Sequence, residues 1–369
     1  MEEQTKTVIK QYSKEVIAEA SELLKQGKLV AFPTETVYGL GANALDADAC
    51  QLIFKSKERP LTDPLIVHVH SLEQSLTLLD QSYQEVVVLF KQLAGRYWPG
   101  PLTMVVKANL ELIPNMITAE TGFVGLRMPN HEIALDLLRT SQLPIAAPSA
   151  NKFGHVSPTK AEHVYNDFYK DSEVFIIDGG QCSFGIESTV LKISYDQEQS
   201  SPYKLKILRR GGVSEQHLRQ SLEELGYSGQ YVLESVQNKH YVEETENLEA
   251  PGQFLRHYSP DIDSYLFSQY KEASTLEFGE CVMLDFGQLF LSLRDKVKYY
   301  HDLSQEGDYV EAINVIYDKL RWAETQKDAK FVLITNFYEI YGNDKGKGIE
   351  HREALFDRIF RATSGKQIL

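Results

Sequence analysis

Apolar residues up to residue 215 follow two alternating periods. Residues 14–26 have apolar side chains at helical spacing, at Val16, Ile17, Ala20, Leu23 and Leu24. The stretch "KLVAF" after Gly27 predicts a buried strand, and "ADACQLIFKSK" predicts a second helix. Further strands are predicted in "PLIVHVH", "LTMVVKA", "GFVGLRM", "LPIAAPSA", "VFIIDGG", "STVLKI" and "LKILRR". This alternation predicts an α/β domain with a mixed sheet over residues 1–215.

The pattern changes after residue 215. Residues 216–262 include the acidic stretch "ESVQNKHYVEETENLEAPGQF", which has few apolar positions and predicts a surface linker. From residue 263 onward, the strand-like "ECVMLDFG" and "AKFVLITNF" alternate with the helix-like "YVEAINVIYDKLRWAE" and "EHREALFDRIFRATS". This order predicts a smaller, Rossmann-like C-terminal α/β domain over residues 263–369.

The composition is that of a globular protein. Hydrophobic residues make up 43% and charged residues 24% of 369 residues, which is enough chain for two domains. The formal net charge of −14 argues against a broad nucleic-acid-binding face. We expect a cytoplasmic protein without a membrane partner, because neither a long apolar run nor a signal peptide is evident. The three scattered cysteines, Cys50, Cys182 and Cys281, are expected to be buried thiols.

Polar side chains follow several of the predicted strands, where open α/β sheets place their ligand crevice. Thr34, Glu35 and Thr36 follow "LVAF", and the cations Lys55, Lys57 and Arg59 close the predicted second helix. Candidate groups on later strands and loops are His68, Arg127, Ser149, Asn151, Ser157, Ser188, Thr189, Arg209 and Arg210. Because these groups lie far apart in the sequence, only the fold can bring them together.

Each group taken alone also has an ordinary structural explanation. Cations favour helix C-termini by up to about 1 kcal/mol. A single strand histidine such as His68 is more often structural than catalytic, and a surface ion pair of Arg127 contributes roughly 0–1 kcal/mol. Serine and asparagine are also ordinary turn residues. The chain has no nucleophile elbow, His-Glu-x-x-His motif or P-loop. Cations and hydroxyls without a nucleophile favour a site that binds anions and positions reactants.

Taken together, the motifs resemble those of YrdC-like proteins. The stretches "FPTETVYGLG", "FKSKERP", "PLIVHV", "YWPGPLT", "GLRMPNH", "PIAAPSANKFG", "GIESTV" and "LRRGG" occur in the family's order. With "APGQFLRHYSP" and a further domain, essentially the whole chain resembles the long, two-domain form of threonylcarbamoyl-AMP synthase. The resemblance implies an N-terminal twisted mixed sheet around a concave, locally positive pocket.

The resemblance also implies a reaction. The family makes L-threonylcarbamoyl-AMP from L-threonine, bicarbonate (or carbon dioxide) and ATP, with release of pyrophosphate. Other proteins then transfer the threonylcarbamoyl group to tRNA. The threonine amine can attack carbon dioxide, and the resulting carbamate can attack the α-phosphate, so the protein has to align reactants and neutralise phosphate charge. Mg²⁺ would be held mainly by the ATP phosphates, so no metal site on the protein is expected.

Residue roles follow from the same resemblance. The family's Lys-x-Arg and Ser-x-Asn signatures fall on Lys57, Arg59, Ser149 and Asn151, which would grip the nucleotide phosphates and the reacting carbamate. L-threonine would be bound by Thr36, His68, Arg127, Ala147 and Ser188. The ATP side would also be lined by Asp63, Phe123, Ser157 and Arg209, and by Tyr258 of a linker that closes as a lid. Asp63 and Phe123 depart from the family pattern, which often has asparagine and a small hydroxylic residue there.

Two alternatives stay open from the sequence. The YrdC-like fold has also been linked to double-stranded RNA, so an RNA-binding or ribosome-associated module without turnover is the main alternative, although the net charge of −14 counts against it. A carbamoyl-transfer accessory, like the YrdC-like segment of hydrogenase-maturation proteins, would be accompanied by acylphosphatase-like and zinc-finger segments, which this chain lacks.

Overall fold

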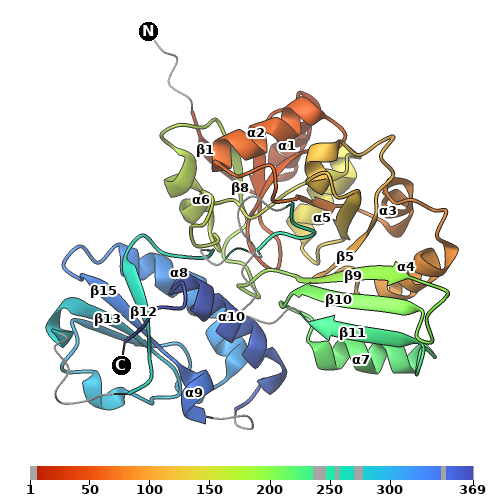
Figure 1. Ribbon diagram of the computed structural model, residues 1–369. Helices are drawn as coiled ribbons and strands as arrows, with labels where there is room; N and C mark the ends of the chain where they lie inside the picture. Colours follow the sequence, from red (N-terminus) through yellow and green to blue (C-terminus); the bar gives the residue numbers. More distant parts are fainter. Residues whose placement is uncertain are drawn as a thin grey trace. The chain divides into compact units, whose positions relative to one another are not determined.

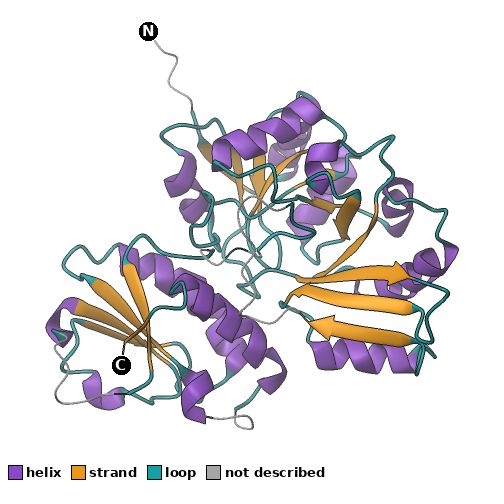
Figure 2. Ribbon diagram, viewed as in Figure 1, coloured by secondary structure: helices purple, strands orange, loops and turns teal. Residues whose placement is uncertain are grey.

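The computed structural model describes residues 6–235, 247–252, 254, 257–269, 277–341 and 346–368. The chain divides into two compact units. The first consists of Met1–Phe153, Pro158–Ser183 and Glu187–Phe254, and the second of Gly154–Ser157, Phe184–Ile186 and Leu255–Leu369. Both are α/β units, which confirms the predicted fold class (Figures 1 and 2).

A mixed sheet forms the centre of the first unit. Within the described residues it has eleven strands, paired side by side in an order that differs from the sequence order. That order is β1 (Val8–Gln11), β8 (Phe175–Asp178), β2 (Val30–Phe32), β3 (Gly39–Asn43), β7 (Ile145–Ala146), β4 (Ile66–His68), β6 (Phe123–Arg127), β5 (Leu102–Lys107), β9 (Thr189–Tyr195), β10 (Tyr203–Arg209) and β11 (Tyr231–Ser235). Parallel pairs such as β4 and β6 alternate with antiparallel pairs such as β5 and β6, as a mixed sheet requires.

Helices cover both faces of this sheet. One face packs its apolar side chains, including Phe32 and Ile177, on α1 (Lys14–Lys25) and α5 (Glu132–Ser141). The opposite face packs on α2 (Ala47–Lys57), α3 (Leu72–Leu78), α4 (Gln84–Tyr97), α6 (Ala161–Phe168) and α7 (Glu215–Glu224). A short 3₁₀ helix, η1 (Asn115–Thr118), precedes β6. Each helix therefore buries one apolar stripe against the sheet.

Capping side chains fix where the predicted helices begin. The Ser13 hydroxyl accepts a hydrogen bond from the backbone N–H of Val16 at the start of α1. The Asp46 carboxylate accepts from the N–H groups of Asp48 and Ala49 at the start of α2. These bonds satisfy donors that a helix leaves without intrahelical partners. The end of α2 then fixes the position of Lys57, its last helical residue.

One part of the first face has no helix over it among the described residues. There, Ile66, Val105, Val190 and Leu208 of four different strands form a small apolar cluster with Ala250. The segment around Ala250 is held by a hydrogen bond from Leu248 N to Thr62 O (2.8 Å) and by an ion pair between Lys192 and Glu249. Non-helical chain therefore packs on this part of the sheet, and we call this part of the sheet the open face.

The glycines of "YGLGAN" lie within β3. A Cβ atom added to Gly41 would lie 2.8 Å from both Ile145 Cγ2 and Phe32 Cε1. Gly41 thus lets strand and side chains pack closely, and its role is not to turn the chain.

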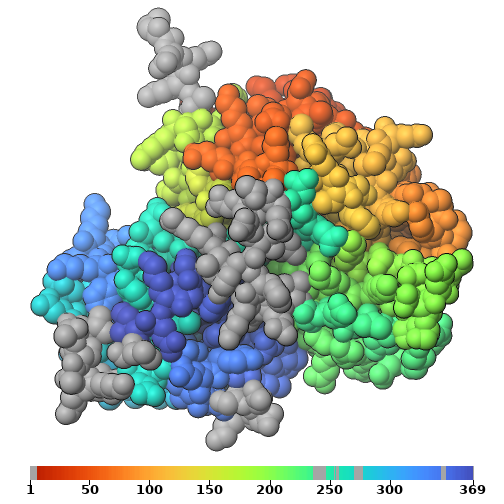
Figure 3. Space-filling model, viewed as in Figure 1, coloured from red at the N-terminus to blue at the C-terminus, as the bar shows by residue number. Residues whose placement is uncertain are grey.

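The predicted linker over residues 216–262 differs from the structure. Residues 215–224 form α7, and Tyr231–Ser235 form β11, which pairs in parallel with β10. Both elements belong to the first unit, and with β10 they form a continuous part of its surface (green in Figures 1 and 3). Their apolar signal is weak because α7 buries only Leu218 and Leu222 among its apolar side chains, and β11 buries only Leu233. Beyond β11, the predicted linker is described only at residues 247–252, 254 and 257–262.

The second unit has a parallel sheet, which confirms the expected parallel α/β arrangement. Its strands pair in the order β14 (Tyr299–Asp302), β13 (Cys281–Asp285), β15 (Phe331–Thr335), β12 (Asp263–Phe267) and β16 (Gln367–Ile368). Its α-helices are α8 (Tyr309–Glu324), α9 (Phe337–Tyr341) and α10 (Arg352–Ala362). Single 3₁₀ turns are η2 (Phe278–Glu280), η3 (Leu291–Leu293) and η4 (Ile349–His351). Helices α8 and α10 contact one another (Figure 1).

Two further expectations concern thiols and membranes. Cys50, Cys182 and Cys281 are free and buried, as predicted. Among the residues that the structure describes, no helix combines the length and apolarity needed to span a bilayer.

We predict that Gly41→Ala destabilises the protein by about 1–3 kcal/mol, because its Cβ would overpack β3 against Phe32 and Ile145. Gly95→Ala in α4 is the matched control, since a Cβ there meets no atom within 4 Å. We expect that variant to gain up to about 1 kcal/mol from helix propensity. Urea unfolding measures both changes, and a Gly41→Ala variant as stable as the wild type would contradict the close packing.

Candidate active site

Side-chain alternation decides which residues lie on the open face. Val67 and Leu126 point into the larger apolar cluster, so their strand neighbours His68 and Arg127 point to the opposite face. The parallel register pairs His68 directly with Arg127. By the same alternation Thr103 and Ser188 point to the open face, and their hydroxyl oxygens lie 2.8 Å apart. Four segments distant in sequence thus contribute polar groups to one face.

Arg127 is buried and held from three sides. Its Nε donates to Gly100 O (3.3 Å), and Nη1 and Nη2 both donate to Thr36 Oγ1 (3.1 Å each). Its Nη2 also lies 2.8 Å from Glu35 Oε1. Thr36 Oγ1 in turn lies 2.8 Å from Thr34 Oγ1, which donates to Val37 O. The "PTETV" turn therefore orients the guanidinium in advance, a geometry suited to gripping a carboxylate or phosphate.

His68 is neutral in this setting. Burial lowers the pKa of its imidazole to about 3, and the nearby charge of Arg127 acts in the same direction. The ring packs edge-on against Phe32 with centroids 6.1 Å apart. Its Nδ1 is buried and has no hydrogen-bond partner among the described residues. A neutral imidazole beside a fixed cation can accept or donate one hydrogen bond to a bound polar molecule.

Lys57 joins the two predicted catalytic loops. Its Nζ donates to Ser149 O (2.7 Å) and to Asn151 O, so the last residue of α2 reaches the "APSAN" loop. The side chain is 1% exposed, and burial lowers its pKa well below the usual value, with Arg59 acting in the same direction. The Asn151 side chain is also buried and donates from Nδ2 to Lys152 O (2.6 Å). The structure thus brings Lys57, Ser149 and Asn151 together.

Arg59 and Asp63 form a buried pair next to Lys57. Arg59 Nη2 lies 2.9 Å from Asp63 Oδ1, and the guanidinium also donates to Asp63 O and Pro64 O at 3.0 and 2.7 Å. Burial raises the pKa of Asp63 to about 6, against the opposing charges of Arg59, Lys57 and Arg209. Asp63 therefore serves first to orient Arg59, which explains how a carboxylate is tolerated among these cations.

Ser188 and Arg209 form the third cluster. Arg209 donates from Nε to Ser188 O and from Nη2 to Ser188 Oγ, both at 3.1 Å. The register of β10 shifts between Ile207 and Arg209, at the end that carries this arginine. A Cβ on Gly211 would lie 2.3 Å from Glu187 O, so the first glycine of "LRRGG" is needed for the chain to pass this close.

The remaining predicted residues divide between the two units. Ala147 donates its N–H to Ile66 O (2.9 Å). Phe123 lies at the edge of the open face, with Lys192 Nζ 3.8 Å from its ring centroid. Ser157 and Tyr258 belong to the second unit, where the Tyr258 ring stacks on Tyr317 at 5.5 Å. Contacts and charge interactions therefore connect the other predicted residues of the first unit in two sets, one around Arg127 and one around Asp63.

Sequence reasoning gave no role to some residues near these groups. Glu35 and Cys182 are buried, and Thr103 contacts Ser188. His131, which follows "RMPN", has a pKa lowered by burial, while the charge of Glu35 raises it. Glu35 lies in the "PTETV" motif and His131 in the "GLRMPNH" motif. Membership of these motifs was therefore the sequence signal that could have pointed to them.

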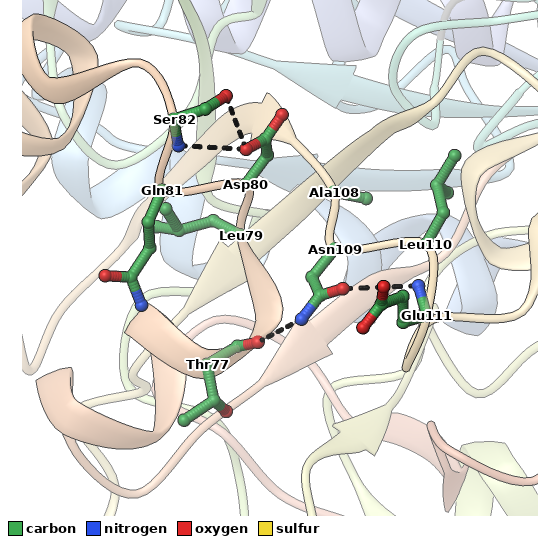
Figure 4. Close-up of a pocket in the computed structure, with 9 residues that line it drawn as sticks. All are labelled: Thr77, Leu79, Asp80, Gln81, Ser82, Ala108, Asn109, Leu110 and Glu111. Atoms are coloured by element: carbon green, nitrogen blue, oxygen red, sulfur yellow. Dashed lines mark hydrogen bonds between the residues drawn. The ribbon is translucent and has the colours of Figure 1, made fainter.

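A hollow in the first unit lies elsewhere. It has a volume of about 750 Å³ and is lined by residues 77, 79–82 and 108–111 (Figure 4). Its polar groups bond to one another: Ser82 N and Oγ both donate to Asp80, and Asn109 Nδ2 donates to Thr77 O. None of the predicted site residues lines it.

The fold and the site define a class of protein, an α/β domain that gathers buried cations on one open face, followed by a second α/β unit with a parallel sheet. A model of the Sua5/YciO/YrdC family, described as telomere recombination, matches residues 22–211. A second model, described as the C-terminal domain of threonylcarbamoyl-AMP synthase, matches residues 213–364. The chain therefore belongs to the Sua5/YrdC family, in the form that carries this C-terminal domain.

Individual relatives agree with this assignment. A threonylcarbamoyl-AMP synthase of Pyrococcus abyssi is 42% identical over 244 residues, which span 66% of this chain and 65% of that protein. A threonylcarbamoyl-AMP synthase of Bacillus subtilis is 32% identical over 95% of this chain and 94% of its own length. The crystal structure of P. abyssi Sua5 complexed with L-threonine has a TM-score of 0.78 and 32% identity, and 98% of each chain is covered. The expectation of a family of enzymes is thereby confirmed.

We predict that acid lowers the free energy of unfolding through the burial of His68. An unfolded histidine binds a proton below pH 6.5, whereas native His68 does so only near pH 3. Between these pH values the unfolded state therefore binds more protons than the native state. The contribution of His68 to the free energy of unfolding is then lost as the pH falls below 6.5. His68→Phe removes this contribution. The difference in unfolding free energy between wild type and variant should shift steadily between pH 7 and pH 4, and a constant difference would contradict a neutral, buried His68.

Proposed function

We propose that this protein makes L-threonylcarbamoyl-AMP from L-threonine, bicarbonate or carbon dioxide, and ATP, with release of pyrophosphate. This would be the first step of threonylcarbamoyladenosine formation in tRNA. The observation that carries the proposal is the open face. It gathers buried cations with His68 Nδ1, Glu35 Oε2 and Asp63 Oδ2, buried atoms that accept no hydrogen bond from the described residues, whereas the other oxygen of each carboxylate pairs with an arginine. Because such atoms are costly when unsatisfied, this arrangement supports a site completed by a polar ligand.

The amino acid would bind at Arg127. Its guanidinium is already oriented by Thr36 and Gly100, so a substrate carboxylate meets a fixed donor pair. His68 beside it and the hydroxyl of Ser188 would add hydrogen bonds, and the N–H and packing of Ala147 would complete this side. The relative crystallised with L-threonine supports an amino-acid subsite in this fold.

ATP would bind on the side of Lys57, Arg59 and Arg209. These cations surround Asp63, and the Ser149 and Asn151 carbonyls fix the Lys57 ammonium group. Negative phosphate would stabilise the charged form of Lys57, whose pKa burial lowers. Preoriented cations of this kind would neutralise the charge that develops as pyrophosphate leaves, with no enzyme nucleophile required. Phe123, Ser157 and Tyr258 stay predictions for the ATP side.

Mg²⁺ would enter with the ATP phosphates. Two carboxylates act on the ATP-side cations among the described residues. Asp167 raises the pKa of Lys57, and Asp63, which lies among the three cations, already pairs with Arg59. Three positive charges around it disfavour a bare dication, whereas they suit a phosphate-bound one. In the described part of the second unit, His155, Asp261 and Glu324 could hold a metal, but Glu324 Oε1 already faces His155 Nε2 at 2.8 Å and Asp261 N at 2.6 Å. These residues therefore give no reason to add a protein metal site.

We predict that Lys57→Ala lowers threonine-dependent pyrophosphate release by roughly 100-fold or more, because the leaving group loses an oriented charge partner. Lys55→Ala is the matched control, since Lys55 lies on the same helix turn but is exposed. The assay mixes the protein with ATP, Mg²⁺, bicarbonate and single amino acids, and thermal unfolding checks that both variants fold.

Two outcomes would decide against this account. Wild-type protein without threonine-dependent pyrophosphate release would contradict the synthase function, and submicromolar, salt-sensitive tRNA binding without turnover would favour the RNA-binding alternative. Full activity of a folded Lys57→Ala variant would contradict the site assignment while leaving the family intact.

A further inference from the structure

Glu35 is a buried carboxylate with few partners. It lies in the turn between β2 and β3, only 7% exposed, between the two threonines that orient Arg127. Its Oε1 lies 2.8 Å from Arg127 Nη2. Neither of its oxygens accepts a well-formed hydrogen bond from any residue in the described part of the chain. Buried carboxylates usually accept several such bonds, so this one has unused acceptor capacity.

The groups that sense the charge of Glu35 supply no second counter-charge. Burial lowers the pKa of His131 below its usual value, so this ring is mainly neutral at pH 7. Burial likewise raises the pKa of the Cys182 thiol, and Glu35 acts in the same direction, so the thiol stays protonated. The neighbouring hydroxyls of Thr34 and Thr36 bond to each other, and Thr36 Oγ1 also accepts from Arg127. Arg127 is thus the cation that Glu35 faces in this part of the structure.

A substrate carboxylate would change this balance. If it binds Arg127, two carboxylates share one guanidinium, and Glu35 is left with an incompletely compensated buried charge. An α-amino acid carries a compensating positive charge, because its ammonium group lies one carbon away from its carboxylate. We propose, on the basis of the proposed function, that Glu35 accepts the α-ammonium group of the amino acid, so that Arg127 and Glu35 together recognise the zwitterion.

This pairing has two consequences, one for the charge of the site and one for the choice of substrate. The site is neutral with Arg127 and Glu35 alone, and it stays neutral when a zwitterion adds one charge of each sign. A hydroxy acid without the ammonium would add a net negative charge and leave two carboxylates on one arginine. The pairing therefore selects amino acids over hydroxy acids of the same shape, and it fixes the nitrogen that has to be carboxylated.

The test is calorimetric titration of the whole protein with two ligands. One is L-threonine, and the other is its 2-hydroxy analogue, 2,3-dihydroxybutyrate of matching configuration. We expect Glu35→Gln to weaken L-threonine binding by roughly tenfold or more, because a hydrogen bond between charged groups is lost. The same substitution should leave binding of the hydroxy acid unchanged or strengthen it, because a competing carboxylate is removed. Glu22→Gln on the exposed side of α1 is the control and should change neither.

Each remaining outcome overturns the inference. Equal weakening of both ligands by Glu35→Gln would mean that Glu35 only positions Arg127, and unchanged L-threonine binding would mean that it takes no part. Glu35→Asp, which keeps the charge, should retain the preference for the amino acid, and its loss in a folded variant would also contradict the pairing. Wild-type protein that binds no L-threonine would instead refute the proposed function itself.

Discussion

The alternation of side chains along four central strands determines which residues lie at the candidate site. In β4, β6, β5 and β9, one set of alternate side chains fills the apolar core under α4, and the other set reaches the open face. A shift of one residue in any of these strands would bury the polar set in the core and expose the apolar one. Because the core fixes the register so firmly, Arg127, His68, Thr103 and Ser188 are held on one face without a helix to position them.

Burial makes this face chemically different from the rest of the surface. The whole chain carries a formal net charge of −14, yet Lys57, Arg59, Arg127 and Arg209 are all buried on the first unit. Backbone carbonyls and nearby carboxylates compensate them, yet burial, together with the charge of Arg59, lowers the pKa of Lys57. Cations held in this way strengthen their interaction with an incoming anion, because solvent screening is weak and little reorganisation is needed. For the interaction with an anion, the local arrangement of buried cations thus matters more than the net charge of the whole chain.

The sequence predicted the central strands and the helices α1, α2, α8 and α10 because their apolar periods are strong. It predicted a linker where α7 and β11 lie, because each buries few apolar side chains and the flanking residues are polar. The site motifs identified the right loops, but not their contacts. The pairing of Arg59 with Asp63 depends on a turn of the backbone, and that of Arg209 with Ser188 on the antiparallel pairing of β9 with β10. The importance of Glu35 needed knowledge of its burial, which no local pattern gives.

The central claim is that Arg127 is an oriented receptor for a substrate carboxylate, and affinity for L-threonine tests it most directly. Arg127→Lys keeps the charge but loses the planar donor fork and the bonds to Thr36 and Gly100. The account predicts that this substitution weakens L-threonine binding by roughly tenfold or more, whereas Arg139→Lys on the exposed side of α5 leaves it unchanged. A folded Arg127→Lys variant that binds L-threonine as tightly as the wild type would contradict the account.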